Sequence, residues 1–444
     1  MNAARRPVGG VSLDTHADLA LARLAPDARA LLDRAATIAL MRGAAPYLVG
    51  GSVRDLLLGR TTIDLDLVVV GDAIGLARAL HEELGGGEIA LLRVHEAFGT
   101  ATVIPQGGTP LDLITARHET YPVPGALPVV TPGTLDDDLR RRDFTINAIA
   151  LALAPETRGQ LYDPLGGRGD LVAGIIRTLH DGSFRDDPTR LLRATRYADR
   201  LGFAFADATA AQFAAVLAAH VFDTITIQRL SHEFVRLLAE ERAAAMLDRL
   251  TASGALAQFA PALRWGDGER AAFQRLDGLE QQFPVSVPVI DAVPRWEARF
   301  AVLTATLSPE GARAAAAVLA LSGRVVLLCG QAATLVASLG EEPLPASDSA
   351  LGRRLDPYEP AALIVAWACT SEAQNAILLL RYLLLMRDVR PQLDGTALRE
   401  LGVPPGPIYR EALAALRDFK RDHLAATVEE ERTFLRSWLA AASH

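Results

Sequence analysis

The feature that most constrains the fold is a change in residue pattern near Ser183. Between Tyr47 and about Ala154, short runs of β-branched or alternating apolar residues predict strands, with an Ala/Leu-rich helical stretch over 73–84 between two of them. After Ser183, apolar residues recur at helical spacing in stretches separated by Gly, Pro or polar residues. The chain therefore predicts one small sheet, of the α+β or α/β type, followed by a long helical region.

The runs that predict strands are YLVGG, IDLDLVVV, TATVI and LDLIT. The main stretches that predict helices outside the sheet region are 26–42, 188–201, 229–238, 243–250, 294–307, 311–321 and 408–419. One segment of the sheet region, 121–133 (YPVPGALPVVTPG), is rich in Pro and Gly and is predicted to lack regular structure. It is either a surface connection or a mobile loop beside the site, and we favour the loop because long Pro/Gly loops are often functional.

Composition is that of a folded protein with a core, since 50% of the residues are hydrophobic and 22% are charged. The two cysteines, Cys329 and Cys369, lie in apolar stretches, which argues against a disulfide framework and predicts a cytoplasmic location. The run 376–386 is too short to span a bilayer and is broken by Arg381, so we expect a core helix and no membrane partner. The net charge of −8 does not by itself favour a nucleic-acid partner.

The first candidate site begins at two adjacent glycines, Gly50 and Gly51, where a predicted strand ends and a helix begins. Glycine lets the backbone of such a turn approach phosphate oxygens closely, because no Cβ stands in the way. Arg54, one turn into the helix, would add a charged fork for the same phosphates. The pattern predicts a phosphate-binding turn, although a Gly-Gly pair before a helix is also a common structural turn.

Two aspartates follow in the next predicted strand. Asp64 and Asp66 alternate with leucine, so their carboxylates share one face of the strand. Adjacent carboxylates repel unless a cation lies between them, and Mg²⁺ prefers such hard oxygen ligands together with substrate phosphates. Asp112, in the later run LDLIT, would supply a third ligand if its strand lies alongside. The expected chemistry is a two-metal clamp on an attacking hydroxyl and a leaving pyrophosphate.

The second cluster is the run RRRDFTINA, from Arg140 to Ala148. Here Arg141 or Arg142 is predicted to reach a triphosphate or a sugar, while Asp143 buttresses an arginine. Asn147, near the end of the run, is a further candidate for nucleotide binding.

The third cluster is DDPTRLLRATRY, in which Arg190, Arg193 and Arg196 form a stripe along one predicted helix. Asp187 before Pro188 is also a good helix N-cap, which is a purely structural alternative. Together, Asp187 and Arg190 offer an acceptor and a forked donor that can pair with the edge of a base. That pair would let a protein select a nucleotide without a nucleic-acid template.

In this order and spacing, the clusters closely resemble the class II tRNA nucleotidyltransferases and bacterial poly(A) polymerases of the polymerase-β-like superfamily. The matching segments within about residues 47–205 are LVGGSVRDLLLGR, DLDLVVVGDA, FGTATV, DLITAR, DLRRRDFTINAIAL, LYDPLGGRGDLVAGIIRTLH and SFRDDPTRLLRATRYADRLGF. A weaker match to the family's tail returns near residue 390.

The resemblance implies an α+β fold with a small mixed sheet in a head, followed by an elongated all-helical neck, body and tail. The expected ranges are an N-terminal helical extension over 1–46, the head over 47–180, the neck over 181–250, and the body and tail over 251–444. The helical body would bind the acceptor end of tRNA.

Family roles carry over to matching positions. Asp64 and Asp66 would bind the catalytic metals, and Gly51, Arg54 and Arg142 would contact the triphosphate. The incoming nucleotide would be held by the third cluster, in which Asp187 and Arg190 read its base; the residues concerned are Asp187, Arg190, Arg193 and Arg196.

The expected function is template-independent addition of CCA, or of its terminal A, to tRNA 3′ ends, with ATP as donor and CTP as well if the whole end is built. Asp186 stands where CCA-adding members usually have glutamate, and the segment TARHETYPVPGALP (115–128) followed by DDPTR is similar to the bacterial branch that includes enzymes adding only the terminal A. A poly(A) polymerase is the near alternative, since it shares every motif. A non-catalytic RNA-binding helical protein is the alternative of another class.

Overall fold

The computed structural model describes residues 21–61, 65–282, 292–403 and 405–442. The chain divides into two compact units, Met1–Glu233 and Phe234–His444. The predicted neck range, 181–250, spans the border between these units.

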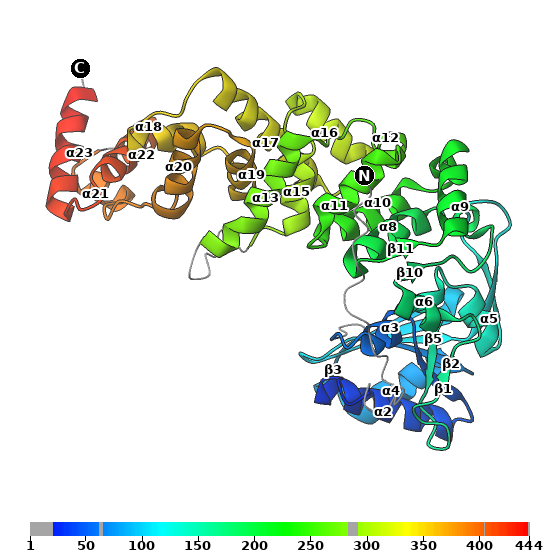
Figure 1. The fold of residues 1–444 in the computed structure, drawn as a ribbon. Coiled ribbons are helices and arrows are strands. Elements are labelled where there is room, and N and C mark those ends of the chain that lie inside the picture. The colour runs from blue at the N-terminus through cyan, green and yellow to red at the C-terminus, as the bar shows by residue number, and fades with distance from the viewer. Residues whose placement is uncertain (1–20, 62–64, 283–291, 404, 443–444) are drawn as a thin grey trace. The chain divides into compact units, whose positions relative to one another are not determined.

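The first unit contains a seven-stranded mixed sheet in the order β3-β4-β5-β2-β1-β8-β9 (Figure 1). Neighbouring strands are antiparallel except for β2 and β5, which are parallel. A mixed sheet at this end of the chain confirms the predicted fold class. The strands are β1 (Ala45–Val49), β2 (Leu65–Val70), β3 (Ile89–His95), β4 (Thr100–Pro105), β5 (Leu111–Thr115), β8 (Ala150–Ala152) and β9 (Leu161–Tyr162).

One face of the sheet is covered by two helices, α2 (Pro26–Met41) and α4 (Ala73–Glu88) (Figure 1). Leu65 and Leu67 of β2 are fully buried, as is Leu113 of β5. Because side chains alternate along a strand, the aspartates between these leucines lie on the opposite face. The apolar pattern therefore directs the carboxylates away from α2 and α4.

The Pro/Gly-rich segment 121–133 is partly regular, contrary to the sequence prediction. Val129–Pro132 forms β7, which pairs antiparallel with β6 (Arg117–Thr120). The β-branched run Val-Val-Thr favours a strand, and Pro132 is tolerated because it ends that strand. Only residues 121–128 form the connecting loop, which we call the 121–128 loop.

Short elements and helices complete the first unit. They are α3 (Gly51–Leu57), η1 (Glu96–Phe98), α5 (Leu135–Arg140), η2 (Thr145–Asn147), α6 (Gly167–Ala173), β10 (Ile175–Ile176), α7 (Ser183–Asp186), α8 (Thr189–Leu201), β11 (Ala204–Phe205), α9 (Asp207–Ala218) and η3 (Val221–Thr224). The next helix, α10 (Ile227–Ala239), crosses the border between the units.

The described part of the second unit beyond α10 is built from helices, as predicted. They are α11 (Ala243–Ala252), α12 (Ala255–Phe259), α13 (Asp267–Gln282), α15 (Arg295–Val302), α16 (Pro309–Val318), α17 (Gly323–Glu341), α18 (Asp348–Leu355), α19 (Pro360–Cys369), α20 (Ala373–Arg381), the π turn η4 (Tyr382–Met386), α21 (Gly395–Glu400), α22 (Pro407–Asp422) and α23 (Val428–Ala442). The predicted helix 294–307 ends early, at Val302, and α16 begins where the Ser308 side chain caps its first turn.

The helix α17 is long and apolar enough to cross a membrane by length and composition. It packs against α15, α16 and α19, and its buried residues include Leu328, Ala332 and Leu335. This packing is that of a core helix.

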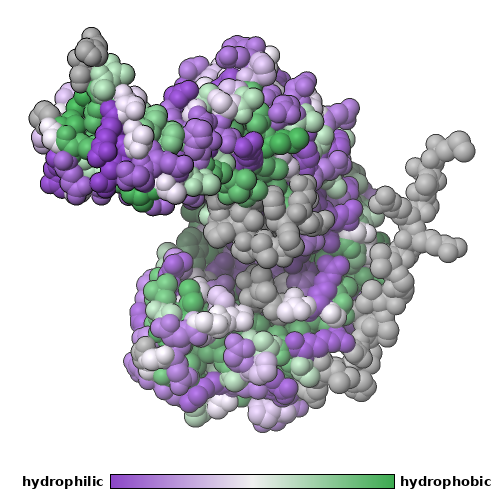
Figure 2. All heavy atoms as spheres, turned by 90° about the vertical axis from the view of Figure 1, so that its left-hand side faces the viewer, coloured by the Kyte–Doolittle hydropathy of each residue, from purple (hydrophilic) through white to green (hydrophobic). Residues whose placement is uncertain are grey.

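The face drawn in Figure 2 carries hydrophobic residues in small groups with hydrophilic residues between them.

The run 376–386 forms α20 and η4, and buries Leu378, Leu379 and Met386, so the prediction of a core helix is confirmed. Neither cysteine forms a disulfide. Burial raises the pKa of Cys329 to about 11, which keeps this thiol protonated at neutral pH.

Candidate active site

Two carboxylates meet on the open face of the sheet. β2 and β5 lie side by side, and Asp66 is directly in register with Asp112, as the sequence required for a shared site. The Thr102 hydroxyl on β4 donates to Asp112 Oδ1 at 2.5 Å, and the Asp66 amide donates to Ser52 Oγ at 3.2 Å. Asp64, the other predicted metal ligand, lies outside the described residues. Within the described chain, no group of three His, Cys, Asp or Glu side chains is arranged to hold a metal.

The Gly50 turn brings a cation beside these carboxylates. Gly50 has φ of 73°, a conformation that favours glycine. A Cβ at this position would lie 2.8 Å from Arg142 Nη1 and 3.0 Å from Asp66 Oδ2, so both side chains converge on the turn. Gly51, the first residue of α3, lies next to the Arg54 guanidinium, with 3.4 Å between its Cβ position and Arg54 Nη2. The turn, Arg142 and Asp66 thus form one site.

Asp138 holds two of the predicted arginines in place. This buried carboxylate accepts from Arg141 Nη2 at 2.6 Å and from Arg142 Nη2 at 2.8 Å. Burial by itself raises the pKa of Asp138, but Arg142 and Arg141 outweigh it and lower the pKa below its usual range. Burial lowers the pKa of Arg142, and Asp138 and Asp66 reverse this, so the guanidinium stays charged. Asp138 therefore buttresses both of these arginines.

Asp143 pairs with an arginine of the helix α8. Its carboxylate accepts from Arg193 Nη2 at 2.5 Å and from Asn147 Nδ2 at 2.9 Å, so it does buttress an arginine, but a distant one. Burial raises the pKa of Asp143, yet Arg193 and the hydrogen bond from Asn147 outweigh it and lower the pKa to about 2. The carboxylate is therefore ionised at neutral pH.

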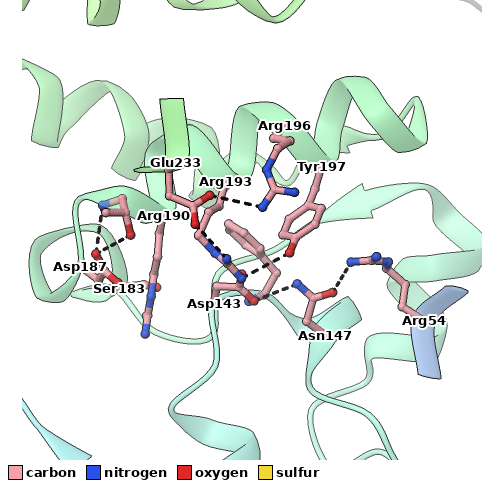
Figure 3. A network of polar contacts seen from close by, with 12 residues as sticks. Arg54, Asp143, Asn147, Ser183, Asp187, Arg190, Arg193, Arg196, Tyr197 and Glu233 are labelled. Atoms are coloured by element: carbon pink, nitrogen blue, oxygen red, sulfur yellow. Dashed lines mark hydrogen bonds and ion pairs between the residues drawn. The ribbon is translucent and has the colours of Figure 1, made fainter. Parts of the chain in front are cut away.

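Asn147 continues the chain of contacts to α3 (Figure 3). Its Oδ1 accepts from Arg54 Nη1 at 2.7 Å, and the Arg54 fork also donates to both oxygens of Asp55 at 2.9 Å. Arg54 is only 2% exposed. Its predicted contact with a triphosphate stays a prediction, since its described partners are protein groups.

Tyr197 and Glu233 join the arginines of α8. Arg193 and Arg196 reach opposite oxygens of Glu233 at 3.5 and 3.3 Å. Arg54, Arg193 and Arg196 also lie over the Tyr197 ring, with guanidinium carbons 4.9, 5.6 and 4.9 Å from its centroid. The predicted stripe exists, and in this structure Arg193 and Arg196 contact the Glu233 carboxylate and the Tyr197 ring.

Asp187 and Arg190 lie at the corner between α7 and α8. Asp187 Oδ1 accepts from the Thr189 amide at 3.0 Å, but the N-cap residue of α8 is Pro188 and not Asp187, as the structural alternative had it. Arg190 is 4% exposed; it donates to Ser183 Oγ at 2.7 Å and to the Arg141 carbonyl at 2.8 Å. In Figure 3 its guanidinium extends away from the contacts that run from Glu233 to Arg54. Arg190, next to Asp187 at this corner, thus lies beside Arg141.

Arg229 lies 2.9 Å from Asp187 Oδ1 through its Nη2. Four residues of this site were not singled out from the sequence: Asp138, Tyr197, Arg229 and Glu233. Asp138 stands three and four residues before the arginines it binds, a helical spacing that is a usable signal. Glu233 lies 40 residues from Arg193, and no local pattern marks such a pair.

Comparison with known proteins identifies the chain's relatives. Residues 46–177 match the family model described as the poly A polymerase head domain. The chain is 35% identical over 434 residues to a CC-adding tRNA nucleotidyltransferase of Deinococcus radiodurans, covering 95% of this chain and 96% of the relative. It is 44% identical over 197 residues to an A-adding tRNA nucleotidyltransferase of Halalkalibacterium halodurans, covering 44% of this chain and 45% of the relative.

A third relative, an A-adding tRNA nucleotidyltransferase of Geobacter sulfurreducens, is 31% identical over 87% of this chain but only 44% of its own length. The match thus spans less than half the length of both A-adding relatives.

Two solved structures share the fold along nearly the whole chain. A CCA-adding enzyme in an apo form has a TM-score of 0.74 at 27% identity, covering 96% of this chain and 98% of that one. The Thermotoga maritima CCA-adding enzyme complexed with tRNA has a TM-score of 0.71 at 26% identity, with the same coverage of 96% and 98%. Since its likeness to the Deinococcus enzyme runs through nearly the full length of both chains, the protein belongs to the tRNA nucleotidyltransferase family.

Proposed function

We propose that this protein extends the 3′ end of tRNA without a template, adding all or part of the CCA end from CTP and ATP. The observation that carries the proposal is the register of Asp66 with Asp112 beside the Gly50 turn and Arg142. This arrangement offers carboxylates for metal ions and a cation for a triphosphate on one side of a small sheet. The full-length similarity to a CC-adding enzyme supports tRNA as the substrate.

Mg²⁺ is the metal that fits the site. Family members depend on a metal, and Asp66 and Asp112 present hard carboxylate oxygens in register, which suit Mg²⁺. We propose Asp64 and Asp66 as its ligands, with Asp112 as a third, and nucleotide phosphates as the remaining partners. When bound, the metal would neutralise the charge that develops on the attacking and leaving oxygens. The chain's own contribution is to hold these carboxylates and Arg142 in place before the nucleotide arrives.

Asp187 and Arg190 support selection of adenine and cytosine. Each of these bases presents an amino donor beside a ring-nitrogen acceptor, whereas guanine and uracil present a carbonyl beside an N–H. A carboxylate acceptor and a guanidinium donor complement the first pattern and oppose the second. The hydrogen bonds from Thr189 to Asp187 and the contacts of Arg190 hold both side chains in place, which a protein template requires.

The second unit is proposed to bind tRNA. A solved relative of the same fold is described as a complex with tRNA, and RNA helices are recognised mainly by shape and backbone. A cytoplasmic location fits this role and the two free cysteines.

The test is incorporation of labelled nucleotide into three tRNA transcripts, ending before CCA, after the first C, and after CC. Each receives CTP, ATP or both with Mg²⁺, and parallel reactions contain a chelator. Ordered addition of C, C and A identifies a complete CCA enzyme; addition of only CC or only A identifies one half of a two-enzyme system. No addition to any transcript by folded protein would overturn the proposal.

Poly(A) polymerase activity is the second candidate, because the matched head model carries that description. Such an enzyme makes long adenylate ladders on unstructured RNA. A protein that shifts tRNA in a salt-dependent manner, yet incorporates nothing, would instead be the non-catalytic binder.

Replacement of Asp187 by asparagine is expected to shift nucleotide preference towards GTP and UTP. The amide of asparagine can donate where the carboxylate only accepts, which suits the carbonyl of guanine or uracil. The ratio of kcat/KM for ATP or CTP over GTP or UTP should fall at least about tenfold. Asp181→Asn is the matched control, because this nearby carboxylate binds Gln212 instead. An unchanged ratio in Asp187→Asn would contradict base reading by this residue.

A further inference from the structure

The carboxylates of the candidate site belong to a row of paired residues that crosses four strands. Asp66 on β2 is level with Asp112 on β5. Asp112 pairs in turn with Thr102 on β4, and Thr102 pairs with Arg93 on β3. Side chains of directly paired residues lie on the same face of a sheet. Arg93 therefore lies in line with the two carboxylates, on the strand at the edge of the sheet (Figure 1).

The residues on either side of Arg93 lie on the opposite face. Leu92 and Val94 pair with Val103 and Ala101, which are buried on the face that α4 covers. Because side chains alternate along a strand, Arg93 is directed to the open face of the sheet. The pairing and the burial pattern thus agree on where this arginine lies.

The charge of Arg93 is available to a ligand. Its side chain is exposed, and across the residues that the structure describes its guanidinium has no ion pair or hydrogen bond. Glu96, the acidic residue that follows β3, pairs instead with Arg78 at 2.7 Å. The buried arginines of the site differ, because protein carboxylates already hold them. Arg93 is therefore a cation beside the candidate site whose charge no described carboxylate balances.

The two sides of the carboxylates face different parts of the proposed reaction. On the β1 side of Asp66 lie the Gly50 turn and Arg142, to which the triphosphate is assigned. In phosphoryl transfer the attacking and leaving oxygens lie roughly in line, on opposite sides of the reacting phosphorus. Since the leaving pyrophosphate belongs to the β1 side, the RNA that carries the attacking hydroxyl approaches from the side of β4 and β3.

Arg93 is within reach of the end of such an RNA. Its strand lies two strand spacings, or about 10 Å, from Asp112. A long arginine side chain can span much of this distance along the open face. Its planar fork suits the oxygens of a phosphate. The backbone phosphates nearest the 3′ hydroxyl are the anions that an RNA would bring to this place.

We propose that Arg93 binds a backbone phosphate within the last two nucleotides of the RNA, and so holds the attacking 3′ hydroxyl towards Asp66 and Asp112. The inference rests on the proposed function, because it requires an RNA end at this site. It assigns to Arg93 no contact with the incoming nucleotide. Loss of Arg93 should therefore weaken use of the tRNA and leave the KM for the nucleotide unchanged.

The first test measures steady-state kinetics on a tRNA transcript that the wild-type protein extends, with tRNA and nucleotide varied separately. In Arg93→Ala, kcat/KM for the tRNA should fall about tenfold, the effect of one charged hydrogen bond. The KM for the nucleotide should stay within about twofold, since the triphosphate is bound elsewhere. Arg93→Lys should retain much of the activity, because lysine also binds phosphate as a point charge. Arg78→Ala is the matched control, since this exposed arginine pairs with Glu96.

The second test identifies the phosphate with a modified RNA. An uncharged methylphosphonate replaces one of the last two linkages at a time. At one of these positions it should lower kcat/KM of the wild-type protein about tenfold, yet change that of Arg93→Ala less than about twofold, because the contact is already absent. The same replacement in the anticodon loop should affect neither protein.

Two results would overturn the inference. One is an equal loss with the wild-type protein and Arg93→Ala at both modified linkages, which would show that Arg93 contacts neither phosphate. The other is a raised KM for the nucleotide in Arg93→Ala, which would place the arginine on the triphosphate. Both leave tRNA extension by the wild-type protein untouched. Failure of the wild-type protein to extend any transcript would instead remove the proposed function.

Discussion

Replacing Asp66 by asparagine is expected to lower the rate of nucleotide addition at least about a thousandfold. Asn keeps the size of the side chain but removes the negative charge proposed to hold the metal. Asp66 Oδ2 lies 3.0 Å from the place where a Gly50 Cβ would be, beside Arg142, so the loss falls at the centre of the site. Initial rates at saturating nucleotide and tRNA measure the effect, and gel shift measures tRNA binding, which should change little.

Two further variants test whether the loss of rate is specific to Asp66. Asp112→Asn should cost less, because Asp112 Oδ1 already accepts from Thr102 and is less free to bind a metal. Asp136→Asn is the control, since this carboxylate forms an ion pair with Arg140 on α5, and it should leave the rate within about twofold. Retention of more than a tenth of the wild-type rate in Asp66→Asn would contradict metal binding by this residue.

Several strands of the sheet could be predicted from sequence, but their pairing could not. Alternation in LDLIT placed Asp112 on one face of a strand, but only pairing could bring that strand beside Asp66. The structure supplies the pairing: β5 is parallel to β2, with Asp112 level with Asp66. Strand β3 was not predicted, although the glycines at 85–87 mark a break in the helical pattern just before its run IALLRVH.

The arginines illustrate what sequence alone does not determine. A run of three arginines indicates strong local charge, yet the partner of each depends on the fold. Arg142 is held by Asp138 at a helical spacing, whereas Arg193 is held by Asp143, 50 residues away. Similarly, the Val-Val-Thr strand of 129–131 was hidden by surrounding prolines and glycines, which are the usual signals of irregular structure. Buried guanidinium groups require counter-charges, and long-range contacts decide which carboxylates provide them.

Asp143→Ala is expected to destabilise the first unit by about 1–3 kcal/mol, because it leaves the half-buried Arg193 without its main counter-charge. The Phe144 amide and Asn147 Nδ2 also lose their acceptor. All tryptophans lie beyond residue 234, so their fluorescence reports the second unit. Hydrogen exchange of amides in α8 and η2 is therefore the suitable measurement, and it should show faster exchange there. In Asp143→Ala/Arg193→Met, where neither charge is buried, most of the loss should be recovered.

The stability that Asp143 contributes depends on pH in a direction that follows from its lowered pKa. The pKa of Asp143 is about 2 in the folded protein and about 3.9 in an unfolded chain, so folding favours its ionised form. The stabilisation by Asp143 is then fully present above about pH 4 and is lost as the pH falls through about 2. The difference in exchange between wild type and Asp143→Ala should be constant from pH 7 to pH 5 and shrink below pH 4. A difference that instead grows on acidification would mean that Asp143 is protonated in the folded protein, and its ion pair with Arg193 of α8 would then not form.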